Sequence, residues 1–140
     1  MVEQLSVFLE NETGGVADVV DVLARVGVDI RALALADETD FGILRLIVNG
    51  PERATSALKD AGFTVRRTPV VAVQIPDRPG GLAGILGALR GTPVEYMYAF
   101  VRKSGEEAFA VFRFEDPEGA IATLRKAGAI ILDADAVQQL

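Results

Sequence analysis

Short runs in which every second residue is apolar occur near the start of the chain and again near its middle. Residues 5–9 and 71–75 follow this pattern, and a period of two is typical of a β-strand with one buried face. A glycine-containing loop follows each run. Apolar residues then recur at i, i+3, i+4 and i+7, which predicts a helix with one apolar stripe. The stripe residues are Val16, Val19, Val20 and Leu23 in the first case and Leu82, Ile85, Leu86 and Leu89 in the second.

The remaining signals also occur twice and in the same order. Second strands are expected at 28–36 and 94–102, and third strands at 42–48 and 108–114. Second helices are expected to begin at Pro51 and Pro117, because proline is favoured at the first helical position. Asp116 is the expected N-cap of the later helix. Short last strands are expected at 64–68 and 130–134, with Pro69 separating the first of them from the second half of the chain.

The chain is an internal duplication. A shift of 66 positions aligns Gly14-Gly15 with Gly80-Gly81 and Pro51-Glu52 with Pro117-Glu118, without a gap. The order βαββαβ therefore occurs twice and predicts an α+β fold of two ferredoxin-like units, residues 1–69 and 70–140. Each unit is expected to be an antiparallel four-stranded sheet with its helices on one face. The connection is too short for a flexible linker, so we expect the units to pack rigidly, joined side by side.

The third strands predict which sheet face packs against the helices. Leu44, Leu46 and Val48, with Ala110, Phe112 and Phe114, are expected to point inward, whereas Arg45 and Arg113 point away. The opposite face is apolar as well, at Phe8, Ile43, Ile47, Phe109 and Val111. Such a face on a small sheet favours contact with a partner, although scattered surface hydrophobes are common. We expect a homodimer; pseudo-symmetry within one chain is the alternative.

Composition excludes several classes of function. The 140 residues include no Cys and no His, which excludes disulfides, Cys/His zinc sites, a thiol nucleophile and an imidazole base. The net charge of −6, the absence of Trp and the lack of a basic block argue against nucleic-acid binding. No apolar run approaches the ~18 residues of a membrane span, and the acidic start does not resemble a secretory signal. A cytoplasmic protein without membrane, metal or cofactor is expected.

The segment Asp77-Arg78-Pro79-Gly80-Gly81-Leu82, between the first strand and first helix of the second unit, is the main candidate for ligand binding. Pro79 stiffens the turn, and Gly80 allows close approach to the backbone. The free N–H groups of the helix start favour a carboxylate, and Asp77 could hold an ammonium, so the pair suits an α-amino acid. Asn11-Glu12-Thr13-Gly14-Gly15-Val16 is the counterpart in the first unit. An ordinary loop with a helix cap is the structural alternative.

These motifs together resemble the ACT domain family. That family has a loop of the form Asn/Asp-x-Pro-Gly-x-Leu, and its second strand often opens like Gly27-Val28-Asp29-Ile30 here. Pro93-Val94-Glu95-Tyr96 is the weaker second copy, and Asp116-Pro117-Glu118 resembles the start of the family's second helix. The resemblance covers nearly the whole chain and implies a tandem ACT protein without an attached catalytic domain.

The resemblance further implies binding of an amino acid at an interface between two units, where the first loop of one unit meets the second strand of the other. One such site combines the 77–82 loop with Asp29, Ile30 and Arg31, and the other combines the 11–16 loop with Glu95, Tyr96 and Met97. The second-unit loop site is expected to be the tighter, because Thr13 replaces the stiffening proline in the first loop. Asp77 and Asp29 would place two carboxylates near one ammonium, which is expected to raise one pKa or to favour a charged amine.

The function expected from the resemblance is to sense an amino acid and thereby modulate a separate partner enzyme. Three other classes of function are weighed against it. Acylphosphatase-like catalysis uses this fold with an Arg and an Asn, but both asparagines, Asn11 and Asn49, lie in the unit that lacks Arg78. An RNA-recognition module needs exposed aromatics, whereas Phe112 and Phe114 are expected to point inward. We therefore expect no catalytic residue and no nucleic-acid partner. A purely structural dimerisation module stays open as the alternative.

Overall fold

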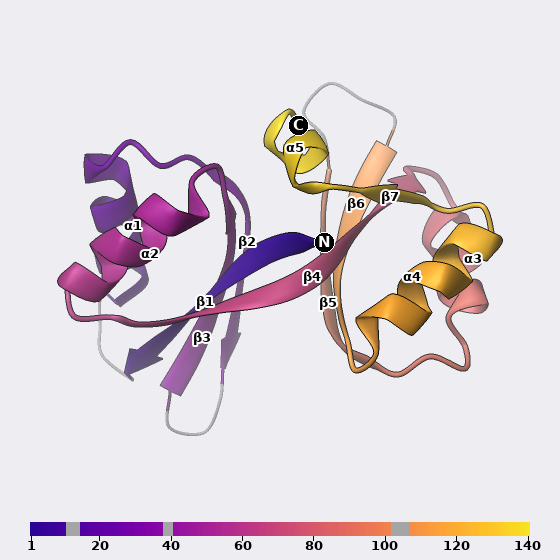
Figure 1. Ribbon diagram of the computed structural model, residues 1–140, viewed down its shortest axis with the longest axis horizontal. Coiled ribbons are helices and arrows are strands. Elements are labelled where there is room, and N and C mark those ends of the chain that lie inside the picture. Colours follow the sequence, from indigo (N-terminus) through magenta and orange to yellow (C-terminus); the bar gives the residue numbers. More distant parts are fainter. Residues whose placement is uncertain (11–14, 38–40, 102–106) are drawn as a thin grey trace. The chain divides into compact units, whose positions relative to one another are not determined.

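The computed structural model describes residues 1–10, 15–37, 41–101 and 107–140. Contacts between residues divide the chain into two compact units. The first unit comprises Glu3–Thr68, and the second comprises Pro69–Leu140 together with Met1–Val2. Seven strands and five helices lie within the described ranges (Figure 1).

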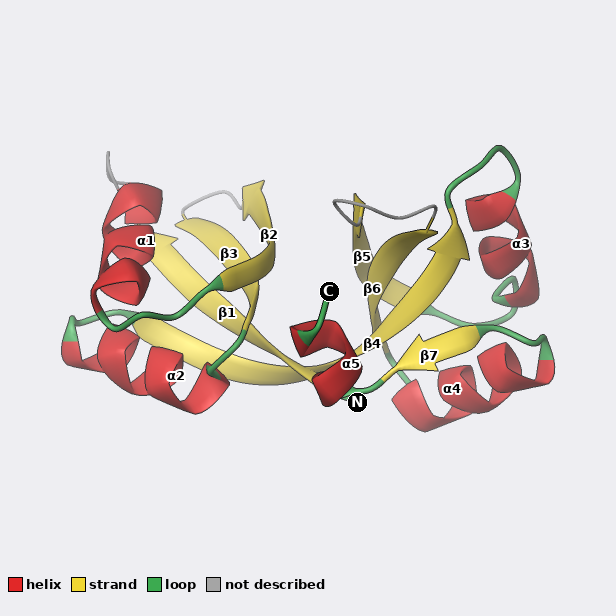
Figure 2. Cartoon of the chain, turned by 90° about the horizontal axis from the view of Figure 1, so that it is seen from above, coloured by secondary structure: helices red, strands yellow, loops and turns green. Residues whose placement is uncertain are grey.

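The first unit contains a sheet with strand order β2-β3-β1-β4. Both β1 and β2 pair with β3 in antiparallel register, with Leu5 opposite Leu46 and Leu35 opposite Leu44. The two helices of this unit lie on the same face of the sheet (Figure 2). Its elements are β1 (Val2–Glu10), α1 (Gly15–Arg25), β2 (Ile30–Asp37), β3 (Phe41–Val48), α2 (Pro51–Asp60) and the first part of β4 (Thr64–Pro76).

The second unit repeats this plan with strand order β5-β6-β4-β7. Strand β6 pairs antiparallel with both β4 and β5, and β4 pairs antiparallel with β7. The predicted ferredoxin-like α+β fold is confirmed. The further elements are α3 (Gly81–Ala88), β5 (Val94–Val101), β6 (Glu107–Phe114), α4 (Pro117–Lys126), β7 (Ile130–Leu132) and α5 (Ala134–Gln138).

Two local predictions were wrong. Strand β4 is a single strand of 13 residues and does not end before Pro69. The carbonyl of Pro69 accepts a hydrogen bond from Arg113 Nη1 at 2.9 Å, so the proline, which has no N–H to donate, still has a polar partner. The last strand ends at Leu132 and not at residue 134, because the Asp133 carboxylate caps α5 by accepting from the Ala136 N–H at 2.8 Å.

Each unit has its own apolar core on the helix side of its sheet. The third-strand residues Leu44, Leu46 and Val48, and their counterparts Ala110, Phe112 and Phe114, are buried there as predicted. Leu23 and Leu58 complete the first core from the helices, and Leu124 does so in the second. On the opposite face, Ile47, Phe109 and Val111 are at most 2% exposed, and the Phe109 ring stacks on Phe100.

The helix ends follow the sequence signals. The Asp116 carboxylate accepts a hydrogen bond from the Gly119 N–H at 3.2 Å, as expected of the N-cap of α4. Gly62 and Gly128 follow α2 and α4 in the left-handed region, with φ of 93° and 82°. Within the described ranges, no helix combines the length and apolar composition needed to cross a membrane.

Candidate functional site

The turn between β4 and α3 depends on two consecutive glycines that have different roles. Gly80 adopts φ 90° and ψ −13°, a left-handed conformation that side-chain-bearing residues rarely adopt. A Cβ atom at Gly81 would lie 2.1 Å from the Pro76 carbonyl oxygen, closer than atoms can approach. We predicted close backbone approach at Gly80, and the structure shows it at Gly81, where the neighbour is the chain's own carbonyl.

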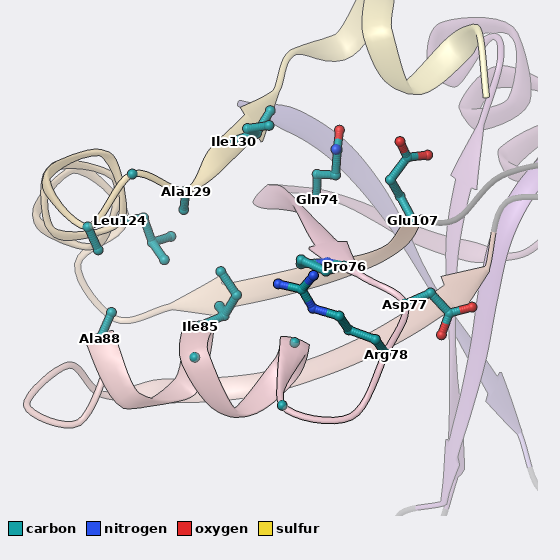
Figure 3. A pocket seen from close by; sticks show the side chains of 15 residues that line it. Gln74, Pro76, Asp77, Arg78, Ile85, Ala88, Glu107, Leu124, Ala129 and Ile130 are labelled. Atoms are coloured by element: carbon teal, nitrogen blue, oxygen red, sulfur yellow. The ribbon is translucent and has the colours of Figure 1, made fainter.

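This turn forms one wall of a cavity of about 900 Å³ in the second unit (Figure 3). The volume lies within the range of small-molecule pockets, roughly 300–1,000 Å³. The cavity lies where β7 begins opposite Gln74, so that the last residues of β4 extend beyond their pairing with β7. Its lining residues are Gln74, Pro76, Asp77, Arg78, Gly80, Gly81, Gly84, Ile85, Ala88, Glu107, Leu124, Ala127, Gly128, Ala129 and Ile130.

The cavity combines an apolar wall with side chains of both charges. Ile85, Leu124 and Ile130 supply the apolar wall. Arg78 extends from the turn toward Pro76 and Ile85, whereas Asp77 points the other way (Figure 3). Glu107 lies opposite Pro76 in the register of β4 and β6 and next to Gln74 in the same view. Among the described residues, neither Arg78 nor Glu107 takes part in an ion pair.

The predicted loop residues of the second unit do not all reach this cavity. Asp77, Arg78, Gly80 and Gly81 line it, whereas Pro79 and Leu82 do not. The Leu82 side chain is 40% exposed. Of the first-unit loop, Asn11, Glu12, Thr13 and Gly14 lie outside the described residues. Gly15 begins α1 and lines a smaller cavity of about 430 Å³ in the first unit.

The predicted residues of the second strands have ionic partners in their own units. Asp29 Oδ2 lies 3.2 Å from Arg31 Nη1, and the Asp29 N–H donates to Asn49 Oδ1 at 2.9 Å. Glu95 Oε2 lies 3.4 Å from Arg113 Nε in the second unit. Ile30 packs against the first core, and Tyr96 pairs in register with Arg113. An arginine thus offsets part of the negative charge of each of the two carboxylates, Asp29 and Glu95. Contact of these carboxylates with a ligand stays a prediction.

Sequence reasoning missed Gln74, Glu107 and Ala129, which line the cavity but lie outside the loop motif 77–82. The duplication held a signal for them. With a shift of 66 positions, these residues align with Phe8, Phe41 and Phe63, so the second unit has smaller or polar side chains at three positions where the first unit has a large aromatic ring.

Comparison with known proteins identifies the family. A protein of Bacteroides thetaiotaomicron, BT0572, is 40% identical, with coverage of 99% of this chain and 96% of that chain and a TM-score of 0.91. The ligand-free regulatory subunit of aspartate kinase from Thermus thermophilus is similar in fold, at 17% identity, coverage of 89% and 91% and a TM-score of 0.65. That from Thermus flavus has 16% identity, coverage of 90% and 92% and a TM-score of 0.60. No curated protein matches significantly. The ACT domain pair family matches residues 1–136, and the chain belongs to that family.

Proposed function

We propose that this chain binds a free amino acid and thereby modulates a separate partner enzyme, without catalysing a reaction itself. One observation carries the proposal: the glycine turn between β4 and α3 opens into a cavity with ligand-sized volume and charged side chains of both signs. The ligand is proposed to meet Arg78, Gly80 and Gly81 in this turn. Support for regulation comes from structural relatives that are themselves described as regulatory subunits of aspartate kinase.

A thermal-shift screen of the purified chain against the twenty amino acids tests this function. A ligand at about 100 times its dissociation constant stabilises the fold by ~2.7 kcal/mol, which raises Tm visibly. We expect a chemically related group of amino acids to raise Tm while the others leave it unchanged. A flat response to all twenty would contradict amino-acid binding.

A structural dimerisation module is the second candidate, and the edge of the first sheet favours it. Strand β2 lies at the end of the strand order. Leu33 and Leu35 on this strand are 54% and 55% exposed, which is unusual for two large apolar side chains so close together. We propose that two copies of the chain associate through this edge. Association without any amino-acid response would favour the purely structural function.

A further inference from the structure

We propose that the cavity of the second unit takes one free α-amino acid with an apolar side chain, and that Phe63 hinders the same binding in the smaller cavity of the first unit. This inference rests on the proposed function and adds the class of amino acid, its orientation and the number of sites. It places the whole binding site within the second unit.

The two cavities are equivalent parts of the duplicated fold. Eight of the nine described residues that line the first cavity align, with the 66-residue shift, with residues that line the second. The eight are Phe8, Glu10, Gly15, Asp18, Phe41, Gly62, Phe63 and Thr64, which align with Gln74, Pro76, Gly81, Gly84, Glu107, Gly128, Ala129 and Ile130. The position of the cavity is therefore a property of the repeat, and differences between the two arise from the side chains.

Side-chain volume explains why the second cavity is twice as large, about 900 Å³ against about 430 Å³. Phe63, half-buried against the first core, occupies the position that Ala129 leaves open in the second unit. Phe8 and Phe41 pack with ring centroids 6.0 Å apart, where the second unit has Gln74 and Glu107. Three rings in the first unit are thus replaced by one methyl group and two polar side chains.

The small residues of α3 enlarge the cavity further. Gly84 replaces Asp18 and Ala88 replaces Val22 of the first unit. A Cβ atom at Gly84 would meet nothing within 4 Å, so this glycine is not needed for packing inside the chain. Glycine lowers helix stability by roughly 0.5–1 kcal/mol relative to alanine, and an open wall of a binding site is a physical reason for it here.

The charges define the orientation of the ligand. A carboxylate fits at Arg78, whose guanidinium extends into the cavity, because arginine can donate two parallel hydrogen bonds to a carboxylate. An ammonium fits at Glu107, on the side of Gln74. Asp77 points the other way and is not assigned to the ligand.

The rest of the cavity wall determines which side chain of the amino-acid ligand fits. Ile85, Leu124 and Ile130, with Ala88 and Ala129, offer a ligand side chain only hydrocarbon surface. Ile130 is 56% exposed, so a charged ligand side chain on this wall would lose part of its hydration, and it would gain no polar partner from these residues in return, which is costly. Leucine-like and phenylalanine-like amino acids fit these conditions, whereas aspartate and lysine do not.

Isothermal titration of the full chain with L-leucine, L-phenylalanine, L-aspartate and L-lysine tests the inference. We expect one apolar amino acid bound per chain and no heat from the two charged ones. Ala129→Phe, which copies the first unit, and Gly84→Asp are expected to weaken binding by about tenfold or more. Phe63→Ala is the matched control and is expected to leave the affinity of the second-unit site unchanged.

Surface variants keep the test valid if Ala129→Phe fails to fold. Arg78→Gln and Glu107→Gln are each expected to weaken binding by about tenfold or more, because a charged hydrogen bond is lost. Asp77→Asn is expected to have little effect. The leucine analogues 4-methylpentanoate, which lacks the amine, and 3-methylbutylamine, which lacks the carboxylate, are expected to bind weakly for the same reason.

The outcomes separate this inference from the proposed function. Unchanged amino-acid affinity in Ala129→Phe, Gly84→Asp and Arg78→Gln would place the ligand elsewhere and overturn the inference, while amino-acid binding itself would stand. Binding of aspartate or lysine in place of apolar amino acids would overturn the proposed ligand class. Absence of binding by any amino acid to the unaltered chain would overturn both.

Discussion

Gly81 packs against the carbonyl of Pro76 so closely that a Cβ atom at this glycine would lie 2.1 Å from the carbonyl oxygen. The Arg78 N–H donates to the same oxygen at 2.9 Å, and the Gly81 N–H donates to the Arg78 carbonyl at 3.0 Å. The turn therefore joins the end of β4 to the start of α3 through backbone contacts that leave no space for a side chain. This tight turn positions Arg78 at the cavity.

Gly81→Ala is expected to destabilise the fold by about 1–3 kcal/mol, because the backbone must shift to relieve the clash. Gly15→Ala is the matched control in the first unit. The Cβ atom at Gly15 would lie 3.7 Å from Leu9, an ordinary contact distance, so the control is expected to change stability little. Urea unfolding of both variants measures the difference. Equal effects would show that the two turns do not differ as the structure indicates.

Gly87→Ala is expected to stabilise the chain. Gly87 lies inside α3, and a Cβ atom there would meet nothing within 4 Å. Alanine removes backbone freedom from the unfolded chain and favours the helix by roughly 0.5–1 kcal/mol. A rise in the midpoint of urea unfolding with unchanged slope would support this expectation, and a fall would show that Gly87 has a packing role.

Asp116→Ala is expected to cost about 1 kcal/mol, because the Gly119 N–H loses its acceptor at the start of α4. The equivalent position in the first unit, Gly50, makes no side-chain cap bond to α2. Gly50→Asp is therefore the complementary variant, expected to gain a few tenths of a kcal/mol. Urea unfolding again gives both values, and the cap assignment fails if Asp116→Ala is neutral.

The sequence was sufficient for the elements whose signals are local or periodic. The alternation at residues 5–9 and the prolines at Pro51 and Pro117 predicted the strands and helix starts correctly, because each signal acts within a few residues. The duplication supplied the topology. The glycine role was assigned one residue too early, because the clash at Gly81 involves a carbonyl five residues back, whose place depends on the folded turn.

Local sequence signals did not predict the cavity, for a related reason. Glu107 and Ala129 come from separate elements, and neither belongs to a motif. Only the comparison of these two residues with Phe41 and Phe63 indicates that the cavity of the second unit has space where aromatic rings occupy the first. A cavity that exists because small side chains replace large ones has no sequence motif. Comparison of the two repeats reveals it only once the fold shows which positions line the same cavity.

Leu35→Lys is expected to separate a homodimer into monomers. Leu35 lies opposite Leu44 on the helix side of the sheet, but it is exposed because β2 is an edge strand. Lysine on an edge strand discourages pairing with another chain, whereas an exposed leucine favours it. Light scattering coupled to size-exclusion chromatography gives the mass of each variant. Leu86→Lys, at an exposed leucine on α3, is the control and is expected to leave the mass at that of a dimer. A monomeric mass for the unaltered chain would contradict the proposed association, and a dimeric Leu35→Lys would move the contact away from β2.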